Sequence, residues 1–209
     1  MFNVNEKYET NTINDPELRI PSEEEVASID PSVRAEMAAA FLRGLEPGRQ
    51  PRELFAEFCR LTTLSTVEVV PIREGAEGLE VWLDQRSEDD PWWPSKWTLP
   101  GVVILPTDAR DDKNSLEGPI ARLFEDELGG IQPIDELREL PSQFRDDSRG
   151  KEVTSQFWTR VETRDEPYSG RFFNIESLRA VPPEGGVLEE SWLTIDRAVA
   201  DYKAQQAQL

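Results

Sequence analysis

The chain has 209 residues, of which 42 are acidic and 23 basic, so its formal net charge is −19 at pH 7. Nucleic-acid backbones and anionic membrane surfaces repel such a protein, and we therefore expect neither nucleic acid nor membrane among its partners. A hydrophobic fraction of 37% and a charged fraction of 31% are typical of a globular chain with polar extensions.

The residue types also limit the chemistry. There is no histidine, and Cys59 is the single cysteine. This composition excludes a Ser-His-Asp triad, a histidine-ligated zinc site and an intrachain disulfide. We expect Cys59 to be a buried thiol on a helix. If the protein is a catalyst, carboxylates and a metal ion are the expected carriers of the reaction.

We predict that the first 62 residues form a polar tail followed by a helical N-terminal extension. Residues 1–21 are polar and aperiodic. Asp30, Pro31 and Ser32 then begin a helix that ends near Gly44, and a second helix is expected over residues 51–61. The N-terminus lacks a basic region followed by an apolar core, and no apolar run could span a bilayer. We therefore expect a cytoplasmic protein.

From Thr66 the hydrophobic period changes from that of a helix to that of a strand. TVEVVPI, a turn in REGAEG and the alternating LEVWLDQR predict a β-hairpin. Extended chain follows in WTLPGVVILP, then a helix in SLEGPIARLFEDELGG and a strand in VTSQFWTRVET. RFFNI is a further extended segment, and Thr194 is expected to cap a last helix. These elements predict one α+β domain over residues 63–209.

The helix containing ARLFEDELGG has two acids on one face. Asp126 and Glu127 lie three and four residues after Leu123, and residues with that spacing share a helix face. A helix that holds Mg²⁺ for diphosphate chemistry needs carboxylates at all three positions, and Leu123 cannot ligate a metal. The pattern fits either a depleted metal-binding face or the solvated face of an ordinary amphipathic helix.

The surrounding segments carry a resemblance to a known family. WTLPG at residues 97–101, followed by R-x-x-x-D-E-x-G at residues 122–129, resembles the Nudix hydrolase motif. The resemblance implies an α/β/α sandwich around a mixed β-sheet, to which this chain adds an α-helical N-terminal extension. It gives Gly101, Arg122 and Gly129 structural roles. Leu123 occupies the position of the family's central glutamate.

The resemblance also implies a metal site and a substrate site. Mg²⁺ or Mn²⁺ would be held by Asp126, Glu127 and Glu152, with Asp126 and Glu127 as the catalytic residues. Substrate would contact Gln85, Arg86 and Trp93. A surface ion pair explains Gln85 and Arg86 equally well, and a tryptophan cluster more often closes a loop over the core. Acids that could replace the missing glutamate are Asp108, Asp111, Asp112 and Glu152.

Two functions remain open at this stage. The first is a divalent-metal-dependent Nudix-type hydrolase that cleaves a nucleoside diphosphate linked to another moiety, with nucleotide sugars among the candidates. The second is a non-catalytic Nudix-fold protein that binds a nucleotide-like ligand or a protein partner. We also hypothesise a homodimer, formed through the N-terminal helices or an exchanged strand.

Overall fold

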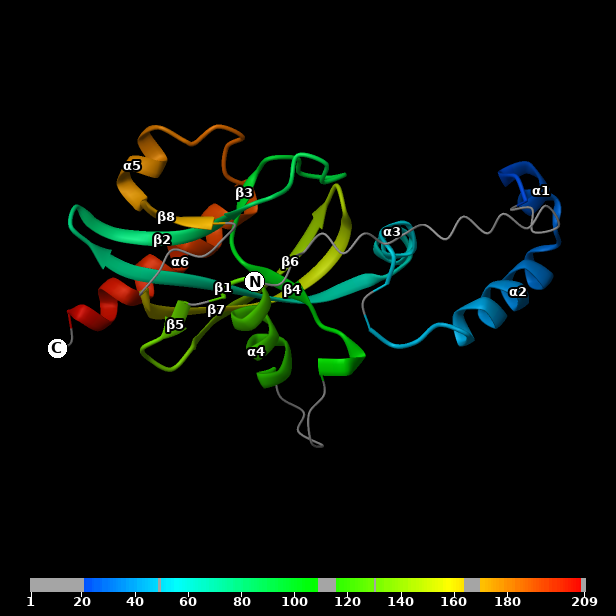
Figure 1. The fold of residues 1–209 in the computed structure, drawn as a ribbon, viewed down its shortest axis with the longest axis horizontal. Coiled ribbons are helices and arrows are strands. Elements are labelled where there is room, and N and C mark those ends of the chain that lie inside the picture. The colour runs from blue at the N-terminus through cyan, green and yellow to red at the C-terminus, as the bar shows by residue number, and fades with distance from the viewer. Residues whose placement is uncertain (1–20, 49, 109–115, 130, 164–169, 208–209) are drawn as a thin grey trace. The chain divides into compact units, whose positions relative to one another are not determined.

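The computed structural model describes residues 21–48, 50–108, 116–129, 131–163 and 170–207 (Figure 1). The chain forms two compact units, Met1–Glu46 and Pro47–Leu209. Much of the polar tail expected at the N-terminus lies outside the described residues. In the part of the chain that is described, no helix has both the length and the apolar character needed to cross a membrane.

The first unit contains two helices with well-formed N-termini. In α1 (Glu23–Ser28), the Ser22 hydroxyl accepts from the Glu25 amide at 3.2 Å, and the Glu25 carboxylate accepts from the Ser22 amide at 2.7 Å. This capping box satisfies two backbone donors at once. In α2 (Pro31–Arg43), Asp30 accepts from the Ser32 amide at 2.9 Å. The sequence predicted α2, whereas it gave no prediction of α1.

The second unit is built on a β-hairpin. Strand β1 (Thr63–Gly75) pairs with β2 (Gly78–Gln85) in antiparallel register, and Ile72 lies opposite Val81. The turn uses Gly78 at φ +118°, a backbone conformation that L side chains rarely adopt. The hairpin predicted from the period-two pattern is confirmed.

The other strands extend this hairpin into a mixed sheet of eight strands within the described residues. They are β3 (Trp97–Thr98), β4 (Gly101–Val103), β5 (Ile131–Pro133), β6 (Arg138–Asp147), β7 (Gly150–Thr163) and β8 (Gly170–Asn174). Strand β1 runs parallel to β7 and antiparallel to both β2 and β4. A parallel pair needs a long crossover, and the chain between β1 and β7 supplies it with helix α4 (Glu117–Asp126).

Helices cover both faces of the sheet. Alternate residues of β1 point to opposite sides. Val67 and Val69 belong to one core cluster with Leu123 and Leu128 at the end of α4. Val70 and Ile72 belong to a second cluster with residues of α5 (Ile175–Ala180) and α6 (Glu189–Gln206). The expected α/β/α sandwich is confirmed, and Figure 1 shows α4 and α6 as distinct layers.

Besides α1, other elements also differ from the sequence prediction. Strand β6 was not predicted, because its sequence RELPSQFRDD is polar and interrupted by Pro141. Helix α6 begins at Glu189, so Thr194 lies inside the helix, and the prediction that it caps the helix is wrong. Its hydroxyl group is hydrogen-bonded to the sheet, as described below. Helix α3 (Arg52–Leu61), predicted as part of the N-terminal extension, lies in the second unit, where its Cys59 is buried as expected.

Candidate functional site

The position of the missing family glutamate is part of the hydrophobic core. Leu123 has no exposed surface and belongs to the same cluster as Val67, Val69 and Trp82. Leu128, one turn further on, is equally buried. The helix therefore presents Leu123 to the sheet, and a carboxylate at this position would lie in an apolar environment.

Arg122, beside Leu123, makes a partly buried ion pair with Asp108. Its Nε donates to Oδ1 of Asp108 at 2.8 Å, and its Nη2 donates to Oδ2 at 2.9 Å and to the Val103 carbonyl at 2.7 Å. The Leu105 amide also donates to Oδ2 of Asp108 at 2.7 Å. The hydrogen bonds that Arg122 donates to the Asp108 carboxylate raise the pKa of Arg122 above its usual value. The pair joins α4 to the 3₁₀ turn Pro106–Asp108 and to β4.

This ion pair gives Asp108, one of the acids expected to replace the missing glutamate, a different role. Both carboxylate oxygens of Asp108 accept hydrogen bonds from Arg122, so Asp108 acts as the partner of the motif arginine. A close backbone contact supports this, because a Cβ on Gly118 of α4 would lie 1.8 Å from the Asp108 carbonyl oxygen. Asp111 and Asp112 lie outside the described residues.

Asp126 and Glu127 lie at the C-terminal end of α4. Asp126 is exposed, while Glu127 is half-buried and its amide donates to the Leu123 carbonyl at 3.0 Å. The charges of both acids help to raise the pKa of Arg122, after the larger effect of Asp108. Gly129 follows as an exposed residue. Gly101, by contrast, lies where β4 approaches β1, since a Cβ there would lie 3.2 Å from the Val67 carbonyl oxygen.

Glu152 is on the opposite face of the sheet, in β7. It is 3% exposed and is paired with two arginines. Arg145 Nη1 lies 3.3 Å from its Oε1, and Arg149 donates to its Oε2. Thr154 donates to the same carboxylate at 3.3 Å. The carboxylate of Glu152 is thus fully engaged by protein donors.

The pairing of Glu152 is one part of a buried polar network that the sequence did not predict. Glu68 of β1 accepts from Arg145 at 2.7 Å, from Gln156 at 3.1 Å and from Thr194 of α6 at 3.2 Å. Burial opposes the charge of Arg145, but the Glu68 carboxylate outweighs it and raises the pKa of Arg145. One signal could have indicated the network: Glu152, Thr154 and Gln156 alternate along β7 on the face where core residues were expected.

The residues expected to contact substrate lie at the end of β2 and in the loop between β2 and β3. Arg86 Nε donates to Oδ2 of Asp90 at 3.0 Å, and Oδ1 of Asp90 accepts from the backbone amides of Trp92 and Trp93. Burial raises the pKa of Asp90, but these hydrogen bonds outweigh it and hold the pKa below the usual value. Gln85 is exposed and donates to the Ser95 carbonyl at 3.2 Å.

Trp93 connects this loop to the buried network. The guanidinium of Arg149 lies 5.1 Å from the centre of the Trp93 ring, and Arg149 also pairs with Glu152. The structure therefore brings Arg86, Trp93 and Glu152 into one connected cluster through Asp90 and Arg149. We call Arg86, Asp90, Trp93, Arg149 and Glu152 the Trp93 cluster.

The described residues do not fit the metal that the resemblance implies. No three cysteine or acidic side chains among them lie together as they would around a metal ion. Asp126 and Glu127 therefore do not share a ligand cluster with Glu152. Mg²⁺ needs several oxygen ligands in near-octahedral geometry, and the carboxylates of Asp108 and Glu152 are held by arginines. We derive no reaction step through a metal.

Comparisons with known proteins agree with this fold. No protein-family model and no curated protein sequence matches the chain. Among solved structures, the NUDIX domain of Shewanella oneidensis NrtR complexed with ADP ribose is similar at 17% identity and a TM-score of 0.50, over 88% of this chain and 99% of that one. The C-terminal domain of mouse MUTYH, in complex with human PCNA, is similar at 16% identity and a TM-score of 0.52, over 68% and 91%. The chain has the Nudix fold, as the sequence resemblance indicated.

A third similar structure corrects one expectation. Shewanella oneidensis NrtR complexed with a 27mer DNA matches at 19% identity and a TM-score of 0.52, over 67% of this chain and 62% of that one. The exclusion of nucleic acid as a partner is therefore wrong, because a protein with this fold binds DNA. A net charge describes the chain as a whole, and it does not describe the local surface that would contact a phosphate backbone.

Proposed function

We propose that this protein is a Nudix-fold binding protein for a nucleoside diphosphate linked to a second group, and that binding requires no metal ion. Leu123 is the observation that carries the proposal. A residue that cannot ligate a metal occupies the central carboxylate position and is fully buried in the core. The buried acid Asp108 forms the ion pair with Arg122. The helix thus keeps its structural role, and the described residues do not supply the ligand set of a metal-dependent catalyst.

The Trp93 cluster has the groups that such a ligand needs. Trp93 is half-buried, and an aromatic ring that stacks on a base contributes about 1–3 kcal/mol. Arg86 has 35% of its side chain exposed, and its planar guanidinium matches a phosphate group. The guanidinium of Arg149 contacts the Trp93 ring and can hold it in place. The complex of ADP ribose with a NUDIX domain of the same fold supports this ligand class.

Titration calorimetry with ADP-ribose in the presence of EDTA tests the proposal. We expect saturable binding, and we expect Arg149→Gln to weaken it by about tenfold or more, because the Trp93 ring loses its support. Arg179→Gln is the matched control, since Arg179 lies 4.8 Å from the Trp192 ring and pairs with Asp196. Absence of binding by the wild-type protein, or equal weakening by both variants, would contradict the proposal.

The competing proposal is the metal-dependent hydrolase that the resemblance implies. Asp126 and Glu127 favour it, because both carboxylates lie near Arg122 at the end of α4. A panel of nucleoside triphosphates, dinucleotides and nucleotide sugars with Mg²⁺ or Mn²⁺ distinguishes the two. Turnover that requires metal and is lost in Glu127→Gln would establish the hydrolase, while binding without turnover supports the proposal made here.

A further inference from the structure

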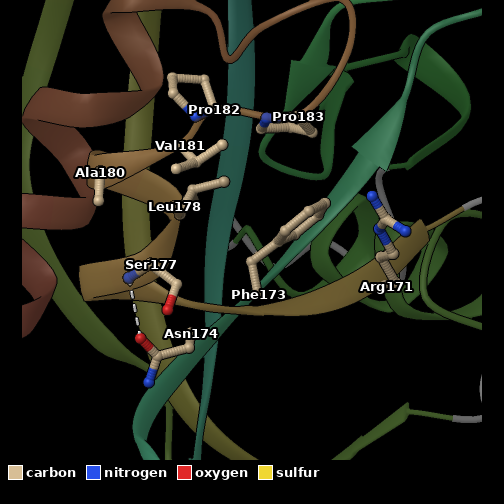
Figure 2. Close-up of a pocket in the computed structure, with 9 residues that line it drawn as sticks. All are labelled: Arg171, Phe173, Asn174, Ser177, Leu178, Ala180, Val181, Pro182 and Pro183. Atoms are coloured by element: carbon tan, nitrogen blue, oxygen red, sulfur yellow. Dashed lines mark hydrogen bonds between the residues drawn. The ribbon is translucent and has the colours of Figure 1, made fainter.

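A pocket of about 390 Å³ lies between β8 and the segment that follows α5. Its walls are mainly apolar, and Figure 2 shows the side chains of Phe173, Leu178, Val181 and Pro183 gathered around it. Leu178 is 2% exposed, whereas Val181 is 78% exposed. Cavities of about 300–1,000 Å³ with apolar walls and few polar groups are typical of small-molecule sites.

Arg171 lines one end of this pocket and is fixed by two aromatic rings. Its guanidinium carbon lies 4.6 Å from the centre of the Phe173 ring and 4.9 Å from that of Trp97. These two rings pack edge to face, with centres 4.8 Å apart. Stacking on rings limits the motion of the guanidinium, so its N–H groups are held in place before any ligand binds.

Arg171 also differs from most arginines of the protein in its charge partners. Ten arginines form ion pairs with carboxylates of the described residues, whereas Arg171 forms none there. It is exposed, in a chain whose net charge is −19. An arginine that is fixed in position at the edge of an apolar pocket, and that has no carboxylate partner among the described residues, complements an anionic group on an apolar ligand.

From these observations we propose that this pocket binds a small aromatic monocarboxylate, with the ring on Phe173, Leu178 and Val181 and the carboxylate on Arg171. The volume of about 390 Å³ sets the size of the ligand, because it has room for a fused ring pair. The charge of Arg171 determines the chemical class of the ligand. Arg171 is the one charged side chain among the described residues that line the pocket, and one guanidinium balances one negative charge, so a monoanion fits better than a dianion such as a phosphate monoester.

Three isosteric or related probes test this assignment by titration calorimetry on the full chain: 1-naphthylacetate, its neutral amide, and 1-naphthyl phosphate. We expect the carboxylate to bind at least about tenfold more tightly than the amide, as for a charge-assisted hydrogen bond. We also expect it to bind more tightly than the phosphate. Equal binding of carboxylate and amide, tighter binding of the phosphate, or no binding of any probe would overturn the proposal.

Two substitutions locate the bound probe. Arg171→Gln should remove the preference for carboxylate over amide, and Arg179→Gln, with the same change in charge on nearby α5, should leave it intact. Val181→Glu should abolish binding of 1-naphthylacetate, and because Val181 is exposed, this variant is expected to fold normally. Full binding by Val181→Glu, or loss of the preference in Arg179→Gln, would place the probe elsewhere and overturn the proposal.

Discussion

Arg122 and Asp108 illustrate how a single ion pair can decide the role of a residue. The side chains are 25% and 6% exposed, and two hydrogen bonds join them. Removing one partner of a buried pair costs about 3–5 kcal/mol, and the partial exposure of Arg122 puts this pair at the lower end of that range. The acid that the sequence offered as a replacement metal ligand therefore contributes to stability.

Asp108→Asn is accordingly expected to lower the free energy of unfolding by about 3 kcal/mol, as measured by urea denaturation. Asp146→Asn is the matched control, because Asp146 is 64% exposed and lies 3.9 Å from Lys151. Exposed pairs contribute about 0–1 kcal/mol. If Asp108→Asn were as stable as the control, the structural role of Asp108 would be refuted.

Leu123→Glu restores the residue that the family motif has at this position. Because Leu123 has no exposed surface, the new carboxylate would be buried among apolar side chains, and we expect the free energy of unfolding to fall by at least about 3 kcal/mol. Urea denaturation measures this loss. A variant that kept its stability and gained metal-dependent hydrolysis would show that the helix can readily form a catalytic site.

Asp147 gives a prediction of pH dependence. Burial raises the pKa of Asp147 above its usual value of 3.8, and the charges of Glu152 and Glu190 raise it further against the opposing charge of Arg149. A group whose pKa is higher in the folded than in the unfolded protein stabilises the fold at pH values below its unfolded-state pKa. This stabilisation is lost as the pH rises through its folded-state pKa. Ionised Asp147 therefore destabilises the fold at neutral pH.

Asp147→Asn should raise the free energy of unfolding at pH 7, and this advantage should shrink as the pH falls toward 4. Asparagine can still accept the hydrogen bond that the Arg149 amide donates to Asp147 at 2.9 Å. Urea denaturation at both pH values measures the difference. A variant that is less stable than wild type at pH 7, or a difference that does not change with pH, would contradict this account.

At the scale of elements, the predictable parts are those with a clear hydrophobic period. The hairpin β1–β2 and helix α4 follow from alternation and from i, i+3, i+4 spacing. Strand β6 has no such pattern. It forms because it pairs with β7 and joins a buried polar network whose members come from distant parts of the sequence. The contacts between Arg122 and Asp108, and between Trp93 and Arg149, were unpredictable for the same reason.

A substitution at Thr194 tests how much the buried polar network contributes to holding α6 on the sheet. Its hydroxyl lies 2.6 Å from Gln156 Nε2 and 3.2 Å from Glu68 Oε2. Thr194→Val keeps the volume but leaves these buried groups with one partner fewer, so we expect a loss of about 1–3 kcal/mol in urea denaturation. Thr62→Val, at the exposed end of α3, should have little effect. A similar loss in both variants would argue against the network.

At the scale of the whole molecule, the candidate residues all belong to the unit Pro47–Leu209. A chain that begins at Pro47 should therefore fold and should bind ADP-ribose as the full chain does. Circular dichroism and titration calorimetry measure both properties. Retained structure with lost binding would show that residues 1–46 contribute to the site, and the Trp93 cluster alone would then be an incomplete description of it.

The most direct test of the central claim is a ³¹P NMR time course of ADP-ribose mixed with the full chain and Mg²⁺. We predict that the two diphosphate resonances shift or broaden and that no monophosphate resonance appears, since the ligand is bound and remains intact. Unchanged diphosphate resonances would contradict binding. A growing monophosphate signal that is absent with EDTA and absent in Glu127→Gln would show that the protein is a metal-dependent hydrolase despite Leu123.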